Sequence, residues 1–300
     1  MAIFPQHELY KATRNLVVDN VNPGEDILIV TSSDQDTRLI DSLTAAVSAN
    51  NPKSVSTIVI ACPEIFVDFV HPNTVLAAVE KADLTIVATT IRFPRAYDDL
   101  SEVIYKFSKR QVLINNAPIE DFSRGASLAD PLTLNADTKR LATLVSNAKK
   151  VRVTSANGTD LSMKVCRPCI SLTGFADKEM GFGSFPSGEA MLVPEEDTGE
   201  GKFVADSFGQ VVYIEGSGPQ IGLKNGPIEL HFKKGNLLEP FLLSEYPRII
   251  YFFLQWNKFV KSFYFDLSIS YNDYGISDLI RNGIFLKNNI SCWAYVHSFS

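Results

Sequence analysis

Residues 26–31 (DILIVT) form a short apolar run rich in β-branched residues, and the same pattern recurs three times in the first half of the chain. The other runs are STIVIA at 56–61, LTIVAT at 84–89 and QVLIN at 111–115. Continuous apolar runs of this length are typical of parallel strands buried on both faces. Stretches with apolar residues at helical spacing alternate with them, at 38–48, 74–81 and 97–107. This alternation predicts a doubly wound α/β domain.

The pattern changes after Lys150. Residues 134–149 first predict a long helix with Leu141, Leu144 and Val145 on one face. Residues 151–165 then alternate around Asn157-Gly158, a strong hairpin signal. Further predicted strands lie at 202–206, 210–215 and 228–233. The predicted fold class is therefore α/β, with a doubly wound parallel-sheet domain at 1–150 and a β-rich (α+β) second domain at 151–300.

Composition narrows the functional classes. The chain has 300 residues, 45% of them apolar, a net charge of −6 and a pI near 5.3, which argues against nucleic acid or an anionic membrane as its partner. The first residues lack a basic segment followed by an apolar core, and the apolar run at 249–256 is too short to span a bilayer. The four cysteines suggest a reducing compartment, and Cys166-Arg-Pro-Cys169 is interpreted as a coincidence of loop sequence. We expect a cytoplasmic protein.

The composition shifts again near Tyr246. The last 55 residues hold 15 of the 32 aromatic side chains and both tryptophans. One interpretation is a continuing β-rich core with an aromatic bias. The other is a sequence that the domain did not originally carry, for example after a change of reading frame. Composition alone leaves both interpretations open.

The stretch 181–201 (GFGSFPSGEAMLVPEEDTGEG) contains the best candidate for a chemical role. Glu189 directly follows a Phe-Pro-Ser-Gly turn, and a carboxylate held by such a turn can bind a metal ion. The alternative is a pair of surface loops with solvated carboxylates. Elsewhere, the loop 31–37 contains no glycine, which excludes a glycine-rich phosphate-binding loop. Its polar residues are explained if Asp36 or Thr37 caps the following helix. His231 is expected to face solvent, because Leu230 and Phe232 alternate with it.

Several of these motifs together resemble the aminopeptidase T-like family of metallopeptidases. The resemblance rests on Gly158-Thr-Asp160, on Phe185–Glu189, on the run from Val193 to Gly201 and on the strand that begins at Gly24. It covers roughly residues 20–240. It implies a homodimer with a metal centre in the second domain that removes N-terminal residues from small peptides, using zinc, cobalt or manganese.

The same resemblance implies which residues bind the metal. Glu189 matches the glutamate of the family's Phe-Pro-x-Gly-Glu turn, Asp273 stands near the position of a further acidic ligand, and His297 stands in for a later histidine. The family's C-terminal His-x-Asp pair is missing from these 300 residues. The implied site is therefore incomplete, and weak or absent turnover is expected.

A related branch is similar to the 2,5-dihydroxypyridine dioxygenases, in which two histidines and a carboxylate hold one iron. Those proteins carry Tyr-Gly-Ile-Ser before a histidine ligand, whereas here Tyr274-Gly-Ile-Ser277 precedes Asp278. Three functions stay open: an aminopeptidase-like hydrolase, a ring-cleaving iron dioxygenase acting on a small molecule, and a non-catalytic homologue.

Overall fold

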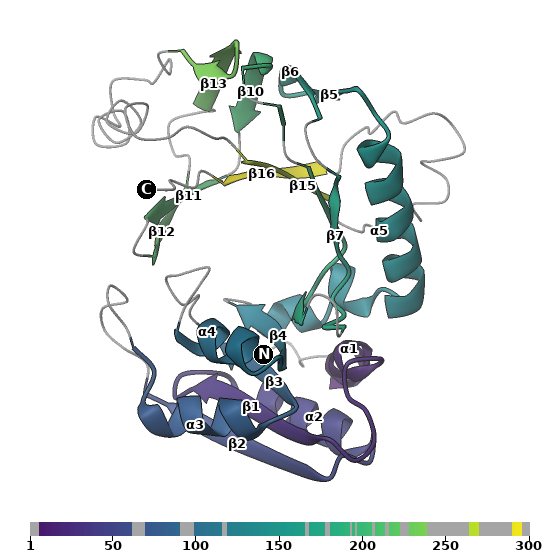
Figure 1. The fold of residues 1–300 in the computed structure, drawn as a ribbon, viewed down its shortest axis with the longest axis vertical. Coiled ribbons are helices and arrows are strands. Elements are labelled where there is room, and N and C mark those ends of the chain that lie inside the picture. Colours follow the sequence, from purple (N-terminus) through teal and green to yellow (C-terminus); the bar gives the residue numbers. More distant parts are fainter. Residues whose placement is uncertain are drawn as a thin grey trace. The chain divides into compact units, whose positions relative to one another are not determined.

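The computed structural model describes most of residues 6–238 and two short strands beyond them (Figure 1). The described residues are 6–61, 70–90, 99–115, 119–165, 168–177, 181–192, 194–195, 197–205, 208–213, 216–222, 228–238, 264–269 and 290–295. They divide into two compact units. The first contains the described residues up to Asp137 together with Leu172–Gly188, and the second contains Thr138–Ser171 and the described residues from Glu189 onward. The units interleave along the chain, and a boundary near Lys150 between independently folding domains stays a prediction.

The first unit is built on a five-stranded parallel sheet in the order β2-β1-β3-β4-β8. Its strands are β1 (Asp26–Ser32), β2 (Ser54–Ile60), β3 (Leu84–Thr89), β4 (Arg110–Asn115) and β8 (Phe182–Ser184). The helices of this part of the chain are α1 (Gln6–Val17), α2 (Thr37–Ser48), α3 (Asn73–Lys81) and α4 (Asp99–Lys106), with short 3-10 turns at Ile119–Phe122 and Gly125–Leu128. The predicted doubly wound α/β domain is confirmed. Strand β8 was not predicted, because it has only three residues and lies after the hairpin of the second half.

Both faces of β1 and β3 are buried, which explains their unbroken apolar runs, whereas the edge strand β2 is largely exposed, contrary to the burial predicted for residues 56–61. Ile27 and Ile29 of β1 pack with α1 and α2 residues such as Leu16 and Leu43. Their neighbours Leu28 and Val30 lie in a second cluster with residues of α3 and α4. Successive side chains of a strand point to opposite faces, so a strand covered by helices on both sides needs apolar residues at every position.

The second unit is rich in antiparallel strands. One sheet has the order β14-β13-β10-β6-β5, another has the order β16-β15-β9-β7, and β11 pairs with β12. The first contains β5 (Lys150–Thr154), β6 (Asp160–Lys164), β10 (Glu200–Ala205), β13 (Ile228–Lys233) and β14 (Asn236–Leu237). The remaining strands are β7 (Ile170–Leu172), β9 (Glu189–Leu192), β11 (Phe208–Tyr213), β12 (Gly216–Gly222), β15 (Tyr264–Ile269) and β16 (Ile290–Tyr295). The β-rich character predicted for this half is confirmed.

Local signals explain the hairpin and the long helix. The turn between β5 and β6 contains Gly158 at a φ of 103°, a conformation that suits glycine. Helix α5 (Pro131–Ser146) buries Leu141 as expected, but Leu144 is 44% exposed because it lies off the buried stripe.

None of the described helices combines the length and the apolar character that a membrane crossing requires.

The return segment, residues 172–188, is held to the first unit by two buried polar side chains. Asn20 is 1% exposed; its Nδ2 donates to the Gly174 carbonyl at 3.0 Å and its Oδ1 accepts from the Ala176 N–H at 2.8 Å. Arg110 donates to the Asn20 carbonyl at 2.9 Å and to the Ala176 carbonyl at 3.3 Å. It also contacts the Glu25 carboxylate, with 2.6 Å between Nη2 and Oε2. These bonds satisfy backbone groups that would otherwise be buried without a partner.

The return segment also approaches itself closely. A Cβ on Gly183, in β8, would lie 2.7 Å from the carbonyl oxygen of Gly174. Only glycine fits there without a shift of the backbone. The close approach lets β8 pair with β4 while residues 174–176 reach Asn20.

Replacing Asn20 with alanine should therefore destabilise the protein by about 3 kcal/mol, because buried backbone groups of Leu16, Gly174 and Ala176 lose their partner. The free energy of unfolding in urea measures this loss. Asn50→Ala is the matched control: it removes one local bond, from Nδ2 to the Ala46 carbonyl, and should cost below about 1 kcal/mol. Equal losses in the two variants would contradict the structural role of Asn20.

Candidate functional site

The turn before Glu189 is anchored at both of its ends within the first unit. The Phe185 N–H donates to the Leu113 carbonyl at 2.9 Å, and the Phe185 ring lies 5.8 Å from the ring of Phe122. At the other end, Ser187 Oγ and the Gly188 N–H both donate to the Leu172 carbonyl, at 2.8 Å and 3.2 Å. The Phe185-Pro186 peptide bond is cis. The turn is thus a firmly packed feature rather than a free surface loop.

Gly188 ends this turn in a backbone conformation that excludes other residues. Its φ is 116°, and an added Cβ would lie 2.7 Å from Leu134 Cδ1. Leu134 is itself 5% exposed, so it has little room to move. The glycine of the Phe-Pro-Ser-Gly-Glu motif is therefore required both by its dihedral angle and by the space available.

Glu189 begins strand β9 in the second unit. The residue is half-buried, and its Oε1 atom is inaccessible to solvent. Its neighbour Ala190 is buried against Leu141 and Ala142 of α5, which fixes the strand on one side. A carboxylate at the start of a strand that is packed in this way has a restricted position, as a metal ligand or a substrate-binding group requires.

The register of the sheet brings a second acidic residue near Glu189 in the ladder. Ser268 of β15 is the partner of Glu189, and Asp266 is the partner of Met191. Asp266 is not recognisable as a neighbour of Glu189 from the sequence, because 77 residues separate the two and only the strand pairing relates them.

The other two residues predicted as ligands, Asp273 and His297, lie outside the described residues. Among the described residues, no group of three or more His, Cys, Asp or Glu side chains is placed to hold a metal ion. The described part of the chain therefore does not by itself fit a complete metal centre. It supplies one restricted carboxylate, Glu189.

The carboxylates of the following turn have a different environment. Glu195, Asp197 and Glu200 are exposed. Glu200 accepts a hydrogen bond from the Lys234 N–H at 2.9 Å, and Asp197 has a φ of 61° where the turn passes Gly235. For these residues the structure matches the interpretation of solvated loop carboxylates.

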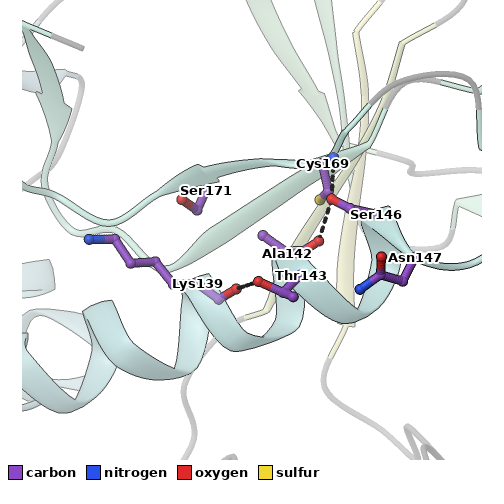
Figure 2. A pocket seen from close by; sticks show the side chains of 7 residues that line it. All are labelled: Lys139, Ala142, Thr143, Ser146, Asn147, Cys169 and Ser171. Atoms are coloured by element: carbon purple, nitrogen blue, oxygen red, sulfur yellow. Dashed lines mark hydrogen bonds between the residues drawn. The ribbon is translucent and has the colours of Figure 1, made fainter. Parts of the chain in front are cut away.

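A shallow pocket lies beside α5 in the second unit, with a volume of about 390 Å³ (Figure 2). Its lining side chains belong to Lys139, Ala142, Thr143, Ser146, Asn147, Cys169 and Ser171. The hydroxyls of Thr143 and Ser146 donate to the helix carbonyls of Lys139 and Ala142, and Ser146 Oγ also accepts from the Cys169 N–H. These bonds hold the start of β7 against the helix. Glu189 does not line this pocket.

Two histidines show where sequence reasoning succeeded and where it did not. His231 is partly exposed beside Glu229, whereas Leu230 and Phe232 are buried, so its predicted orientation is confirmed. His71 is buried, with Nδ1 2.6 Å from Asp99 Oδ1. The pair joins the start of α3 to the start of α4 across 28 residues, a relation that no local spacing shows.

Helix ends account for two further acidic residues of the first unit. Asp36 caps α2 by accepting from the Arg38 N–H at 2.9 Å, as predicted, and hydrogen bonds from the Arg38 side chain lower its pKa. Asp130 precedes α5 and accepts hydrogen bonds from the hydroxyl and the N–H of Thr133, which lower its pKa. These carboxylates stay charged at neutral pH to stabilise helix N-termini.

Comparison with known proteins adds the family. The family model of NicX, 2,5-dihydroxypyridine 5,6-dioxygenase, matches residues 8–213. The chain belongs to this family. The matched residues of this chain include the parallel sheet and the Glu189 turn. In the resemblance seen from the sequence, this family came second, as a branch related to the aminopeptidase T-like family.

Two solved structures share the fold. The 2,5-dihydroxypyridine dioxygenase from Pseudomonas putida KT2440 is 19% identical, with a TM-score of 0.57, over 88% of this chain and 77% of that one. Wild-type AmpT from Thermus thermophilus is 12% identical, with the same TM-score, over 91% and 81%. At this identity the likeness shows the fold alone. No curated protein sequence matches significantly. A relation to the 2,5-dihydroxypyridine dioxygenases and to AmpT is supported. Membership of the aminopeptidase T-like family is not confirmed.

The constraint at Gly188 gives a test of the turn. Gly188→Ala should destabilise the protein by about 2–4 kcal/mol, from backbone strain and from the contact with Leu134. Gly24→Ala is the matched control, because Gly24 has a φ of 83° with nothing within 4 Å of an added Cβ. That variant should cost only about 1 kcal/mol.

A double-mutant cycle separates strain from contact. In a Leu134→Ala background the Gly188→Ala change should cost about 1 kcal/mol less, since the clashing methyl group is gone. Unfolding free energies of the four proteins measure this coupling. Strict additivity of the two changes would show that the described contact does not exist.

Proposed function

We propose that this chain is an enzyme that opens the ring of a small hydroxylated pyridine with O2. The observation that supports the proposal is the NicX family match over residues 8–213, more than two-thirds of the chain. In a ring-opening dioxygenation, both atoms of O2 enter the product as one ring bond breaks. The reaction therefore needs no added reductant, and O2 and the pyridine should disappear in equal amounts.

The proposal includes a metal ion. For oxygenation the expected ion is iron, with Glu189 as one ligand and Asp273 and His297 as the further candidates. Glu189 is the only one of the three within the described residues. Its half-buried carboxylate, at the start of a packed strand, supports its inclusion.

A second candidate is a metal-dependent aminopeptidase using zinc, cobalt or manganese. It is favoured by the Phe185–Glu189 turn, which resembles the peptidase motif more closely than the dioxygenase one. The fold shared with AmpT is compatible with it. In both cases the partner is a small substrate, with no role proposed for nucleic acid or membranes. A cytoplasmic location and a homodimer remain part of the proposal.

One experiment distinguishes the candidates. The purified chain is stripped with a chelator, reloaded separately with Fe²⁺, Zn²⁺, Co²⁺ or Mn²⁺, and given 2,5-dihydroxypyridine or Leu-p-nitroanilide. The proposal predicts turnover with Fe²⁺ alone, slow because the ligand set is incomplete, with O2 uptake equal to pyridine consumption. Release of p-nitroaniline with Zn²⁺, Co²⁺ or Mn²⁺, without O2 uptake, would favour the peptidase. Inertness with every metal would overturn both enzymatic functions and leave a non-catalytic homologue.

Variants connect the activity to the site. Glu189→Gln keeps the shape of the side chain but removes its charge, and it should lower kcat/KM at least about tenfold together with the bound iron content. Glu195→Gln makes the same change six residues later, in the exposed turn, and should leave both quantities unchanged. An unaltered Glu189→Gln enzyme would exclude Glu189 as a ligand.

A further inference from the structure

Strand β2 is the last strand at one edge of the parallel sheet. It pairs with β1, and within the described residues no strand pairs with its other side. Figure 1 shows it as the outermost strand of that sheet. Its sequence, SVSTIVI, has no charged residue, no proline and no glycine. Protected edges usually carry charged residues or proline to prevent pairing with another chain, and residues 54–60 contain neither.

The backbone bonds at the ends of β2 show which residues face outward. The Ile60 carbonyl accepts from the Ser33 N–H at 2.8 Å, and the Ser54 N–H points to the Glu25 carbonyl, both on the side of β1. The direction of the backbone polar groups alternates along a strand. The N–H and C=O groups of Ser54, Ser56, Ile58 and Ile60 therefore point toward β1. The N–H and C=O groups of Val55, Thr57 and Val59 therefore point away from the sheet.

The side chains of the same three residues form an incompletely covered strip. Val55 is half-buried against the cluster that includes α2, whereas Thr57 is exposed and Val59 is 62% exposed. All three are β-branched, the type that pairs best across neighbouring strands. Ile58 and Ile60, on the other face, pack in the cluster of α3 and α4.

The edge is also electrically compatible with a copy of itself, although the chain carries a net charge of −6. Residues 54–60 are uncharged, and the flanking Lys53 is paired with Asp26 at 2.7 Å. Bringing two such edges together places no unpaired like charges opposite one another within the strands.

We propose that β2 is a homodimer interface, in which two copies pair antiparallel about a two-fold axis at Thr57. In that register Thr57 faces Thr57 of the second copy, and Val55 faces Val59 in both directions. Each facing pair exchanges two backbone hydrogen bonds, because all three residues point their polar groups outward. Facing residues lie on one face, so Val55 of one copy covers the exposed Val59 of the other. The two five-stranded sheets become one continuous sheet, and the interface is isologous.

The oligomeric state tests this interface. Sedimentation equilibrium of the full chain should give twice the 33.2 kDa mass at micromolar concentration. Thr57→Lys places two like charges opposite each other and should raise the dimer Kd at least about tenfold. Val70→Lys is the matched control, since Val70 is 69% exposed and lies outside β2, and it should leave the dimer unchanged.

A cross-link supplies an independent readout. Thr57→Cys should form a reducible disulfide between two copies, because facing residues have Cα atoms about 5.5 Å apart, within the range of disulfides. Val70→Cys should not form one. A monomeric wild-type chain, or a dimer that Thr57→Lys leaves intact and Thr57→Cys does not link, would overturn the proposal.

Discussion

The attachment of the return segment to the parallel sheet is the constraint on which the candidate site depends. Residues 172–188 come from beyond the first hairpin, yet they add β8 to the sheet and place the Phe-Pro-Ser-Gly turn against its core. Asn20 and Arg110 hold this segment through its backbone. Without these bonds, buried carbonyl and N–H groups at 174 and 176 would have no partner, a cost comparable to a large part of a domain's net stability.

The attachment makes the turn before Glu189 rigid and sets it apart from the following acidic turn. Carboxylates in turns are usually solvated, and Glu195, Asp197 and Glu200 are exposed. The turn at 185–188 differs because hydrogen bonds to Leu113 and Leu172 fix both of its ends and Gly188 fills a space that admits no side chain. The next residue starts a packed strand. A carboxylate held in this way loses little further freedom on binding a ligand, which is the physical reason to regard Glu189 as functional.

Much of the fold could be predicted from local pattern. The four apolar runs and the Asn157-Gly158 turn indicated the parallel sheet and the first hairpin, because β-branched apolar strands and a tight turn each leave a signature in adjacent residues. The candidate site was only partly predictable. Glu189 could be recognised from its motif. Contacts between residues distant in sequence produce the other features, which are the return of 172–188 to the first unit, the His71–Asp99 pair and the register of Asp266. Asp273 and His297 stay predictions.

Hydrogen exchange at single amides tests the central claim, that the turn before Glu189 belongs to a segment packed on the sheet. The amides of Ala176, bonded to Asn20, and of Phe185, bonded to Leu113, are the informative ones. They should exchange as slowly as the amides of β4, since both require opening of the same packed unit. Exchange at the rate of an exposed loop, with β4 still protected, would contradict the account.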